Sequence, residues 1–547
     1  MKNRILKFNI LIILFIIFGV FFFVMSSFSA KHYIRAGATG ANTGTSWTDA
    51  WNNFGAVNWS RADTYYLAGG TYNENVSIPS ITGTSWIIIK KANTIDNGSE
   101  PGWDESFATN QAVINGNLTS LTGSIEIDGV TGTDTSGHGI KFNPSTSLSV
   151  VILANGTGPY RLSHLEIKGP GFDYGSMGTD GIYYNLGLKG FYVSYCWIHE
   201  ISRNGMTIGS SVGTSYSDYG MLFENNVLGE TGGVGIAYPG IHGQCIQIGY
   251  AATDSFIIIR NNIFKNVYGQ GPISYLGKGT HSQSRIYNNV FYSTEPGKYS
   301  NASVIFMHAS SVSVSDMYIY NNTFYNLGGY GSHIRSDYTG ATNLEVKNNL
   351  WVSCPFGNHH IGITSLSNND YYNNIGPNIP TGETNQKTES SDPFLNSVGY
   401  DFHLKPTANA KDNGLNLAGI FTTDKDGVSR PQGAAWDIGA YEYKETSSVE
   451  ETRHEKSLPL CQNYPNPFQY TTNIEYTLPH SGKVSIKIYD MQGQLLRDLF
   501  SGYIDEGKYT TTWDGRTDAG SEAPNGVYVY RIQFEGLAIA GKMVVVR

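Results

Sequence analysis

The sequence predicts an all-β protein: a parallel β-helix followed by a small β-sandwich. Three observations support this fold class. Glycine, tyrosine and phenylalanine are abundant, at 64, 37 and 25 residues, whereas only 15% of the residues are charged. A motif with two adjacent asparagines recurs through the middle of the chain, and period-2 strands separated by turns fill its last part. Strands joined by tight turns need this mixture, because glycine and asparagine accept positive φ and aromatic rings fill pleated surfaces.

The asparagine pairs are interpreted as corners of a coil. Each follows an alternating apolar strand and precedes an apolar or aromatic residue, and the second asparagine falls at 226, 262, 289, 322, 349 and 374. We expect three short strands per coil, stacked at ~4.8 Å, so that a dozen coils form a rod on the order of 60 Å long. Asparagine accepts the left-handed conformation, and its amide can bond to the asparagine of the next coil. A propeller is the alternative, but its blades of ~40–50 residues exceed the intervals between the pairs.

The N-terminus has the pattern of an export signal. Lys2, Arg4 and Lys7 form a basic start, an apolar run covers residues 10–25, and small residues follow. We therefore predict a signal peptide at residues 1–30. An uncleaved anchor is the alternative, although the apolar run is short for a membrane span.

Charge and cysteine content exclude two classes of function. The formal net charge is −9, and an acidic protein repels nucleic-acid phosphates, so no nucleic-acid partner is expected. The four cysteines, Cys196, Cys245, Cys354 and Cys461, form no CxxC pair. Buried free thiols are expected rather than a metal site or a disulfide framework. We expect the protein to be a monomer.

Segments at both ends of the repeat region resemble a known superfamily. Residues 33–51 and 62–72 are similar to the capping helix and first coil of the right-handed parallel β-helix superfamily of pectate lyases and chondroitinase-B-type polysaccharide lyases. Residues 392–443 resemble its closing coils. The resemblance implies a right-handed parallel β-helix over residues 31–443, with an extracellular polysaccharide as partner. A short helix starting near Thr48 is expected to plug the open core.

The C-terminal part resembles a sorting module. Residues 444–460 are polar and charged, as in a linker. Residues 461–547, which begin with the motif Asn463-Tyr-Pro-Asn-Pro-Phe, resemble the type A sorting domain of the type IX secretion system. This implies a small Ig-like β-sandwich, export through the type IX secretion machinery, and an extracellular or outer-membrane-surface location. An Ig-like carbohydrate-binding module is the alternative.

Candidate site residues lie on the third strand of each coil, where alternate side chains point outward. The outward positions and the residues beside them supply eight candidates. Lys278, His308 and also His281 are candidates for the catalytic base, and Arg335 is predicted as the partner of a uronate carboxylate, which is the chemistry that a polysaccharide lyase needs. The predicted substrate-binding residues are Tyr183, Gln247, Ser274, His281 and Asp337. No metal ligand is assigned, because the stretch before Lys278 has no carboxylate; a requirement for Ca²⁺ stays open.

Two functions fit this sequence. The first is a secreted or cell-surface protein that binds an extracellular polysaccharide and cleaves it in a lyase-like or hydrolytic reaction. The second is a non-catalytic adhesin or glycan-binding rod. The sequence motifs of known polysaccharide lyases are missing, which favours the binding function. The long variable loops are compatible with an enzyme.

Overall fold

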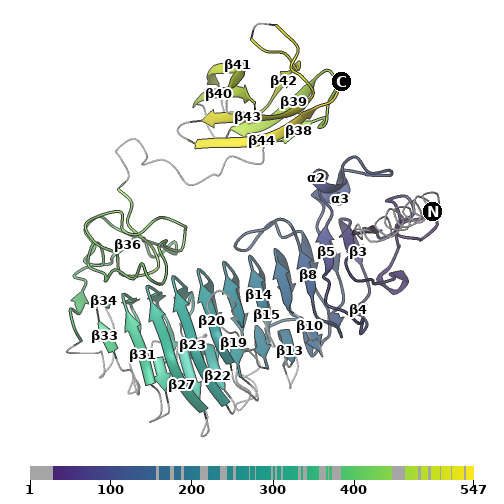
Figure 1. The fold of residues 1–547 in the computed structure, drawn as a ribbon. Helices are drawn as coiled ribbons and strands as arrows, with labels where there is room; N and C mark the ends of the chain where they lie inside the picture. The colour runs from purple at the N-terminus through teal and green to yellow at the C-terminus, as the bar shows by residue number, and fades with distance from the viewer. Residues whose placement is uncertain are drawn as a thin grey trace, which may run out of the picture. The chain divides into compact units, whose positions relative to one another are not determined.

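The computed structural model describes the chain in two compact units, Met1–Lys444 and Glu445–Arg547 (Figure 1). The described residues are 29–154, 159–172, 178–185, 190–209, 220–233, 243–249, 254–269, 271–276, 279–296, 300–301, 305–308, 312–329, 334–336, 342–355, 365–367, 369–372, 383–445, 462–478, 482–490, 494–504, 507–518, 520–534 and 537–547. Residues 1–28 of the predicted signal peptide and most of the predicted linker lie outside them. No helix among the described residues has the length and apolar character needed to cross a membrane.

The first unit contains three long parallel sheets, which we name A, B and C. The chain passes from sheet A to B to C in each coil, so that every strand pairs in parallel with its equivalents in neighbouring coils. Sheet A consists of β1 (Lys31–Ile34), β2 (Thr64–Leu67), β5 (Ile87–Lys91), β8 (Ile125–Asp128), β11 (Tyr160–Ser163), β14 (Phe191–Ser194), β17 (Met221–Glu224), β20 (Asp254–Arg260), β23 (Gly279–Tyr287), β27 (Val312–Tyr320), β31 (Thr342–Lys347) and β33 (Ser365–Ser367).

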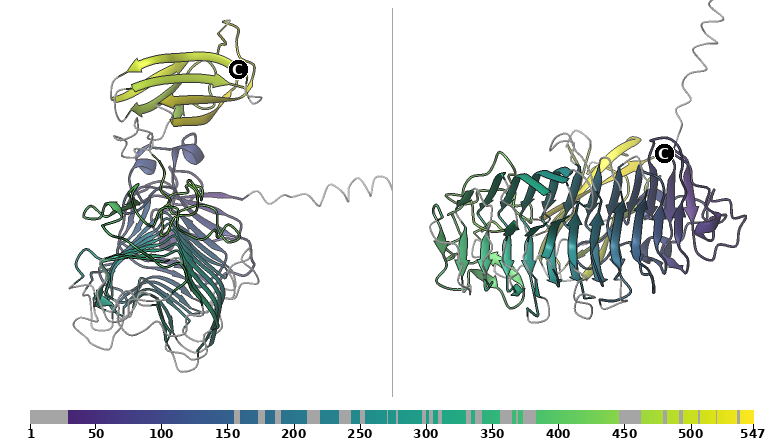
Figure 2. Two further views of the ribbon diagram at one scale, coloured as in Figure 1. Left: turned by 90° about the vertical axis from the view of Figure 1, so that its left-hand side faces the viewer. Right: turned by 90° about the horizontal axis from the view of Figure 1, so that it is seen from below.

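Sheets B and C form the other two sides of the coil. Sheet B consists of β3 (Gly70–Tyr72), β6 (Ala112–Ile114), β9 (Ile140–Phe142), β12 (Leu165–Lys168), β15 (Trp197–Ile201), β18 (Val227–Thr231), β21 (Ile263–Val267), β24 (Val290–Tyr292), β28 (Thr323–Tyr325), β32 (Leu350–Val352), β34 (Asp370–Tyr372) and β35 (Lys387–Thr388). Sheet C consists of β4 (Val76–Ile78), β7 (Leu118–Ser120), β10 (Ser149–Ala154), β13 (Asp180–Asn185), β16 (Met206–Ile208), β19 (Gln244–Ile248), β22 (Gly271–Leu276), β26 (Ile305–His308) and β30 (Ile334–Ser336). The predicted right-handed parallel β-helix is confirmed, and Figure 2 shows its stacked strands from two further sides.

Like residues stack inside the coil because the strands are in register. Phe264, Phe291, Phe324 and Trp351 occupy one interior row of sheet B. Their successive ring centroids lie 4.6, 4.9 and 4.8 Å apart. This spacing equals the distance between strands, so each coil extends one continuous apolar core.

The asparagine pairs form the corner between sheets A and B, as predicted. In the five pairs that the structure describes, the first asparagine has positive φ, between 49° and 59°. The second forms a buried ladder in which Asn226 Nδ2 donates to Asn262 Oδ1 at 3.0 Å and Asn262 Nδ2 donates to Asn289 Oδ1 at 3.0 Å. The ladder continues through Asn322 and Asn349.

The last rung of this ladder differs from the prediction. Asn349 Nδ2 donates to Asn369 Oδ1 at 3.1 Å, and Asn369 N donates to Glu383 Oε1 at 2.8 Å. Asn374, the predicted sixth position, lies outside the described residues. The final coil is therefore shorter than the repeat suggested, and a carboxylate ends the ladder.

The N-terminal plug also differs in detail. No helix begins at Thr48; the short 3₁₀ helix η1 covers Phe54–Ala56, and Asn53 caps it by accepting from Ala56 N. Trp51 and Phe54 join the core at this end of the coil. Further out are two single-turn helices, α2 (Thr94–Asn97) and α3 (Ser106–Thr109). Aromatic rings rather than a longer helix shield the first coil from water.

Residues 390–443, which we call the strap, correct a second expectation. The last strand of the stack is β35, which precedes the strap; the strap then turns back over the side of the stack instead of closing its end. Its Phe394, Phe402 and Ile438 pack on Val290 and Leu350 of sheet B. The strap contains the antiparallel pair β36 (Phe394–Asn396) and β37 (Asp401–Leu404), and a separate two-residue pair joins β25 (Ser300–Asn301) to β29 (Gly328–Gly329). The strap thus covers sheet B from β24 onward and contacts Ile263 of β21. We call the remaining part, from β3 to β18, the open part because the strap leaves it uncovered; the loop that follows β8 reaches this part, where His138 Nε2 lies 3.1 Å from the Tyr195 carbonyl oxygen.

The second unit is an antiparallel β-sandwich, as predicted. One sheet holds β38 (Gln462–Tyr464), β39 (Thr472–Leu478) and β42 (Gly507–Trp513); the other holds β41 (Leu495–Ile504), β40 (Gly482–Tyr489), β43 (Gly526–Phe534) and β44 (Leu537–Val545). Ile474, Ile486 and Trp513 belong to the core between them.

The cysteines match the expectation where they are described. Cys196, Cys245 and Cys354 are buried free thiols, and Cys461 lies outside the described residues. Burial raises the pKa of all three thiols to about 12. They therefore remain protonated and unreactive at neutral pH.

Candidate functional site

The predicted substrate-binding residues on sheet C do fall in one row. Tyr183, Gln247 and Ser274 lie in one row on neighbouring strands, with Thr207, which was not in the predicted set, between Tyr183 and Gln247. Asn204 Nδ2 binds both Thr207 Oγ1, at 2.8 Å, and Gln247 Oε1, at 2.9 Å. Much of the hydrogen-bonding capacity of this row is therefore used within the protein.

Two residues of the predicted set are fully buried. Ser274 and His281 have no exposed surface, and His281 Nδ1 lies 3.1 Å from Oδ2 of the buried Asp254. The ring of His281 also meets that of Tyr275 edge-on, at 5.4 Å between centroids. These contacts place His281 in the interior, so a solvent-facing role for Ser274 and His281 does not match the structure.

The predicted catalytic set is only partly placed. Lys278 and Asp337 lie outside the described residues. His308 is opposite Leu276, two residues beyond Phe306, which continues the row from Ser274. Arg335 is opposite Phe306. The side chains of His308 and Arg335 are not described, so the proposed roles of Lys278, His308 and Arg335 stay predictions.

A polar cluster that the sequence did not reveal lies on the open part of sheet B. Glu166 Oε1 is 2.6 Å from Lys141 Nζ and 3.2 Å from His199 Nε2, and Gln111 Nε2 donates to Glu166 Oε2 at 3.2 Å. Burial alone would raise the pKa of Glu166, but these hydrogen bonds outweigh it and lower the pKa to about 2. Glu166 is therefore a carboxylate at any physiological pH and cannot serve as a proton donor.

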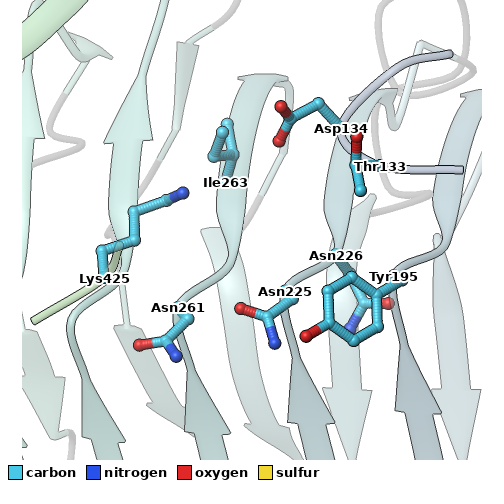
Figure 3. Close-up of a pocket in the computed structure, with 8 residues that line it drawn as sticks. All are labelled: Thr133, Asp134, Tyr195, Asn225, Asn226, Asn261, Ile263 and Lys425. Carbon is cyan, nitrogen blue, oxygen red and sulfur yellow. The ribbon is translucent and has the colours of Figure 1, made fainter. Parts of the chain in front are cut away.

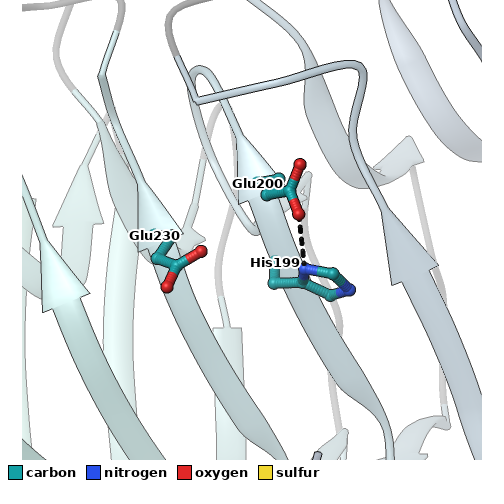
Figure 4. Close-up of side chains that lie close together, drawn as sticks. All are labelled: His199, Glu200 and Glu230. Atoms are coloured by element: carbon teal, nitrogen blue, oxygen red, sulfur yellow. Dashed lines mark ion pairs between the residues drawn. The ribbon is translucent and has the colours of Figure 1, made fainter.

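Two further carboxylates approach the same histidine (Figure 4). His199 Nδ1 is 3.5 Å from Glu200 Oε1, and one ligand atom each from His199, Glu200 and Glu230 lie within 4.8 Å of one another. One imidazole nitrogen with two carboxylates suits a transition-metal ion better than Ca²⁺, which prefers oxygen ligands. This group of three side chains could not be predicted from the sequence, because Glu230 belongs to the next coil, where Gly229 pairs with His199.

Aromatic rings border the cluster. The rings of Trp197 and His199 stack with centroids 3.6 Å apart and planes 9° apart. Tyr195, at the corner before β15, stacks on His164 at 5.1 Å and 5°. Tyr195 is 37% exposed and Trp197 is partly buried, so both rings reach the surface beside hydrogen-bonding groups, whereas His199 is buried.

A pocket lies next to this cluster, along the corner between sheets A and B (Figure 3). Its volume is about 150 Å³, smaller than the roughly 300–1,000 Å³ of sites for drug-sized ligands. It lies between the loop that follows β8 and the strap, and it is lined by Thr133, Asp134, Tyr195, Asn225, Asn226, Asn261, Ile263 and Lys425. This pocket could not be predicted from the sequence, because Asp134 and Lys425 are distant in the chain.

Comparisons with known proteins give a family only for the second unit. The family described as the FlgD Ig-like domain matches residues 469–536. No curated protein sequence matches the chain significantly. The Ig-like character of the sandwich is thus confirmed.

Solved structures with some likeness include three of interest. Dimeric latent PorU from Porphyromonas gingivalis is 26% identical over 16% of this chain and 9% of its own length, with a TM-score of 0.15. The PL6 family alginate lyase AlyGC is 12% identical over 60% of this chain and 48% of its own length, with a TM-score of 0.31. A tailspike protein of E. coli bacteriophage HK620 is 9% identical over 94% and 84%, with a TM-score of 0.26. This chain therefore spans less than half the length of the first two. Topology and the family match together identify a right-handed parallel β-helix followed by an Ig-like β-sandwich.

Proposed function

We propose that this protein is exported and binds an extracellular polysaccharide along the open part of sheet B and its corner with sheet A. One observation carries the proposal: aromatic rings and hydrogen-bonding side chains lie close together on two neighbouring coils, in the part of sheet B that the strap leaves uncovered. Tyr195 and Trp197 offer rings, while Glu200 and Glu230 offer acceptors. Sugar rings present apolar faces and hydroxyl edges, which such a surface complements.

Repetition supports an elongated ligand. Equivalent positions recur at ~4.8 Å along the stack, so a polymer can lie across several coils and contact a different side chain on each, such as Glu166 and Trp197. Each contact adds to the affinity, and a chain of sugars gains from this more than a compact ligand does. A surface polysaccharide therefore fits the geometry better than a free monosaccharide.

Binding is tested with the purified full chain and a panel of immobilised polysaccharides. We expect retention on at least one polymer, and Trp197→Ala should weaken it about tenfold or more because a stacking ring is lost. Tyr470→Ala is the matched control, since this exposed tyrosine belongs to the other unit. Retention on no polymer, or equal loss in both variants, contradicts the proposal.

Cleavage of the bound polymer is the second candidate. It is favoured by Glu200 and Glu230, whose ligand oxygens lie within 4.8 Å, close to the ~5–5.5 Å between the carboxyl groups of retaining glycosidases. Release of reducing ends that Glu230→Gln abolishes, while binding persists, would support a hydrolase. Unsaturated, ultraviolet-absorbing products would instead support a lyase and the predicted Lys278, His308 and Arg335. Binding without products would leave a non-catalytic adhesin.

Export through the type IX machinery is part of the proposal. The predicted signal peptide and the resemblance of residues 461–547 to a sorting domain support it. Removal of residues 461–547 in a host with this secretion system should keep the protein inside the outer membrane, whereas the full chain reaches the surface or the medium. Equal surface amounts of both forms would contradict the sorting role.

A further inference from the structure

One position of every coil stands at the corner between sheets A and B. In successive coils it is occupied by the corner row: His164, Tyr195, Asn225, Asn261, Asn288, Asn321 and Asn348. All seven have positive φ, from 49° to 59°. The residues before them pair in register, so the seven side chains form one line along the outside of the stack.

The last three members of the corner row bind the backbone of the strap. Asn288 Nδ2 donates to Thr423 O at 2.9 Å. Asn321 Nδ2 donates to the carbonyl oxygens of Asp437 and Gly439. Asn348 donates to Leu415 O and accepts from Leu415 N, at 2.9 and 2.8 Å. The corner row is therefore a line of amides that holds a polar chain laid across it.

The two preceding asparagines have the same conformation but no such occupant. The side chains of Asn225 and Asn261 make no hydrogen bond within the described part of the chain, and Asn261 Oδ1 is a shielded acceptor without a partner there. Both line the pocket, side by side on successive coils, with Lys425 beyond one end and Tyr195 at the other (Figure 3). Polar groups in this state gain free energy when a ligand completes their hydrogen bonds.

We propose that this pocket binds one neutral pyranose residue of a polysaccharide chain, a more specific claim that rests on the proposed function. The amides of Asn225 and Asn261 bind neighbouring hydroxyls, and the ring of Tyr195, 37% exposed and stacked by His164 on one face, packs against the sugar. Asp134 and Lys425 bind hydroxyls at the rim, one as acceptor and one as donor. The sugar thus takes the place on the corner row that the strap occupies further along.

Charge favours a neutral sugar over a uronate. The pocket contains one carboxylate and one ammonium group, Asp134 and Lys425, so its own charges cancel. The chain as a whole carries a formal net charge of −9, which disfavours a polyanion. In the cluster beside it, Glu200 is paired with Lys168 at 3.3 Å, and Glu230 adds a further carboxylate that would repel a uronate.

The test compares binding of the full chain to neutral polysaccharides (a glucan, a galactan, a mannan and a xylan) and to uronate polymers (alginate and polygalacturonate). We expect a neutral polymer to bind, and the double variant Asn225→Gly with Asn261→Gly to weaken it at least about tenfold. Glycine keeps the positive φ and removes only the amide. Lys425→Met and Tyr195→Ala should each weaken binding, whereas Tyr195→Phe should retain it.

The matched control is Asn42→Gly with Asn385→Gly, two exposed asparagines that also have positive φ, 56° each, but lie outside the pocket. Unchanged thermal unfolding of all variants shows that they fold. If the pocket variants bind normally while Trp197→Ala does not, the pocket assignment fails and the proposed function stands. Selective binding of uronate polymers overturns the choice of a neutral sugar. Binding of no polymer by the parent overturns both.

Discussion

Asn348 and Leu415, which are 67 residues apart in the chain, are joined by two hydrogen bonds: Nδ2 of Asn348 donates to the carbonyl oxygen of Leu415, and Oδ1 accepts from its amide. The asparagine side chain thus acts as a strand partner for the strap. These two hydrogen bonds hold the strap on the corner row, in the part of the stack that follows the open part of sheet B. The covered length of sheet B is set by such contacts.

Asn348→Gly should loosen the strap. The glycine keeps the positive φ of 56° but leaves the Leu415 backbone without its partners, so we expect a loss of about 1–3 kcal/mol in the free energy of unfolding. Limited proteolysis should then cut residues 410–425 faster than in the parent. Asn385→Gly, exposed and also at 56°, serves as control; equal stability of both variants would show that the contact contributes nothing.

Asn289→Ala should be more damaging, because Asn289 is in the middle of the buried ladder. Its amide donates to Ile259 O and Asn322 Oδ1 and accepts from Asn262, so alanine leaves several buried groups unpaired. We expect a loss of about 2–5 kcal/mol, measured by urea unfolding. Asn115→Ala, at an exposed asparagine, should cost far less; similar losses would argue against a structural role of the ladder.

Stability should depend on His403 in the neutral to alkaline range. Its ring nitrogens lie 2.9 Å from Asp426 Oδ2 and 2.6 Å from Asp401 Oδ1. Burial would lower the pKa of His403, but the two carboxylates outweigh it and raise the pKa to about 9. A raised folded-state pKa contributes stability that is complete below the unfolded value of 6.5 and is lost as the pH rises through about 9.

His403→Gln tests this dependence. The Tm difference between parent and variant should be largest below the unfolded-state pKa and should shrink towards zero above the folded-state pKa. The pKa of Asp426 is lowered despite its burial, so the same ion pair should also weaken in acid as that carboxyl group is protonated. A Tm difference that is constant with pH would contradict the assignment.

Arg430→Met should destabilise the strap strongly. Arg430 Nη1 lies 2.8 Å from Glu442 Oε2, and both side chains are almost completely buried. Loss of one partner leaves an uncompensated buried charge, at a cost of about 3–5 kcal/mol. The double variant Arg430→Met with Glu442→Gln should recover part of this loss in chemical unfolding. No recovery would mean that the pair does not act as a unit.

Much of the fold could be predicted from sequence because the asparagine pairs are local signals. They need positive φ at the first residue and a buried amide at the second, and both requirements are met at Asn288 and Asn289. The last rung was misplaced because Asn369 follows Asn349 after only 20 residues. The strap was mistaken for closing coils because its local turns do not show that it folds back to Asn288.

The site was harder to predict than the fold. Sheet C was chosen for its outward residues, but sequence alternation does not show which outward positions are covered, and Ser274 proved to be buried. The Glu166 cluster escaped notice because Lys141, Glu166 and His199 come from three successive coils. Contacts of this kind depend on which residues of neighbouring coils are opposite each other. This register cannot be inferred from the sequence, because the loops between the strands differ in length.

Side-chain footprinting with hydroxyl radicals tests the central claim, that a polysaccharide binds to sheet B and its corner with sheet A. The full chain is oxidised with and without a polymer that it retains. We predict that Tyr195 and Trp197 become protected while Tyr183 on sheet C reacts as before. Protection of Tyr183 with unchanged reactivity of Tyr195 and Trp197 would contradict the account.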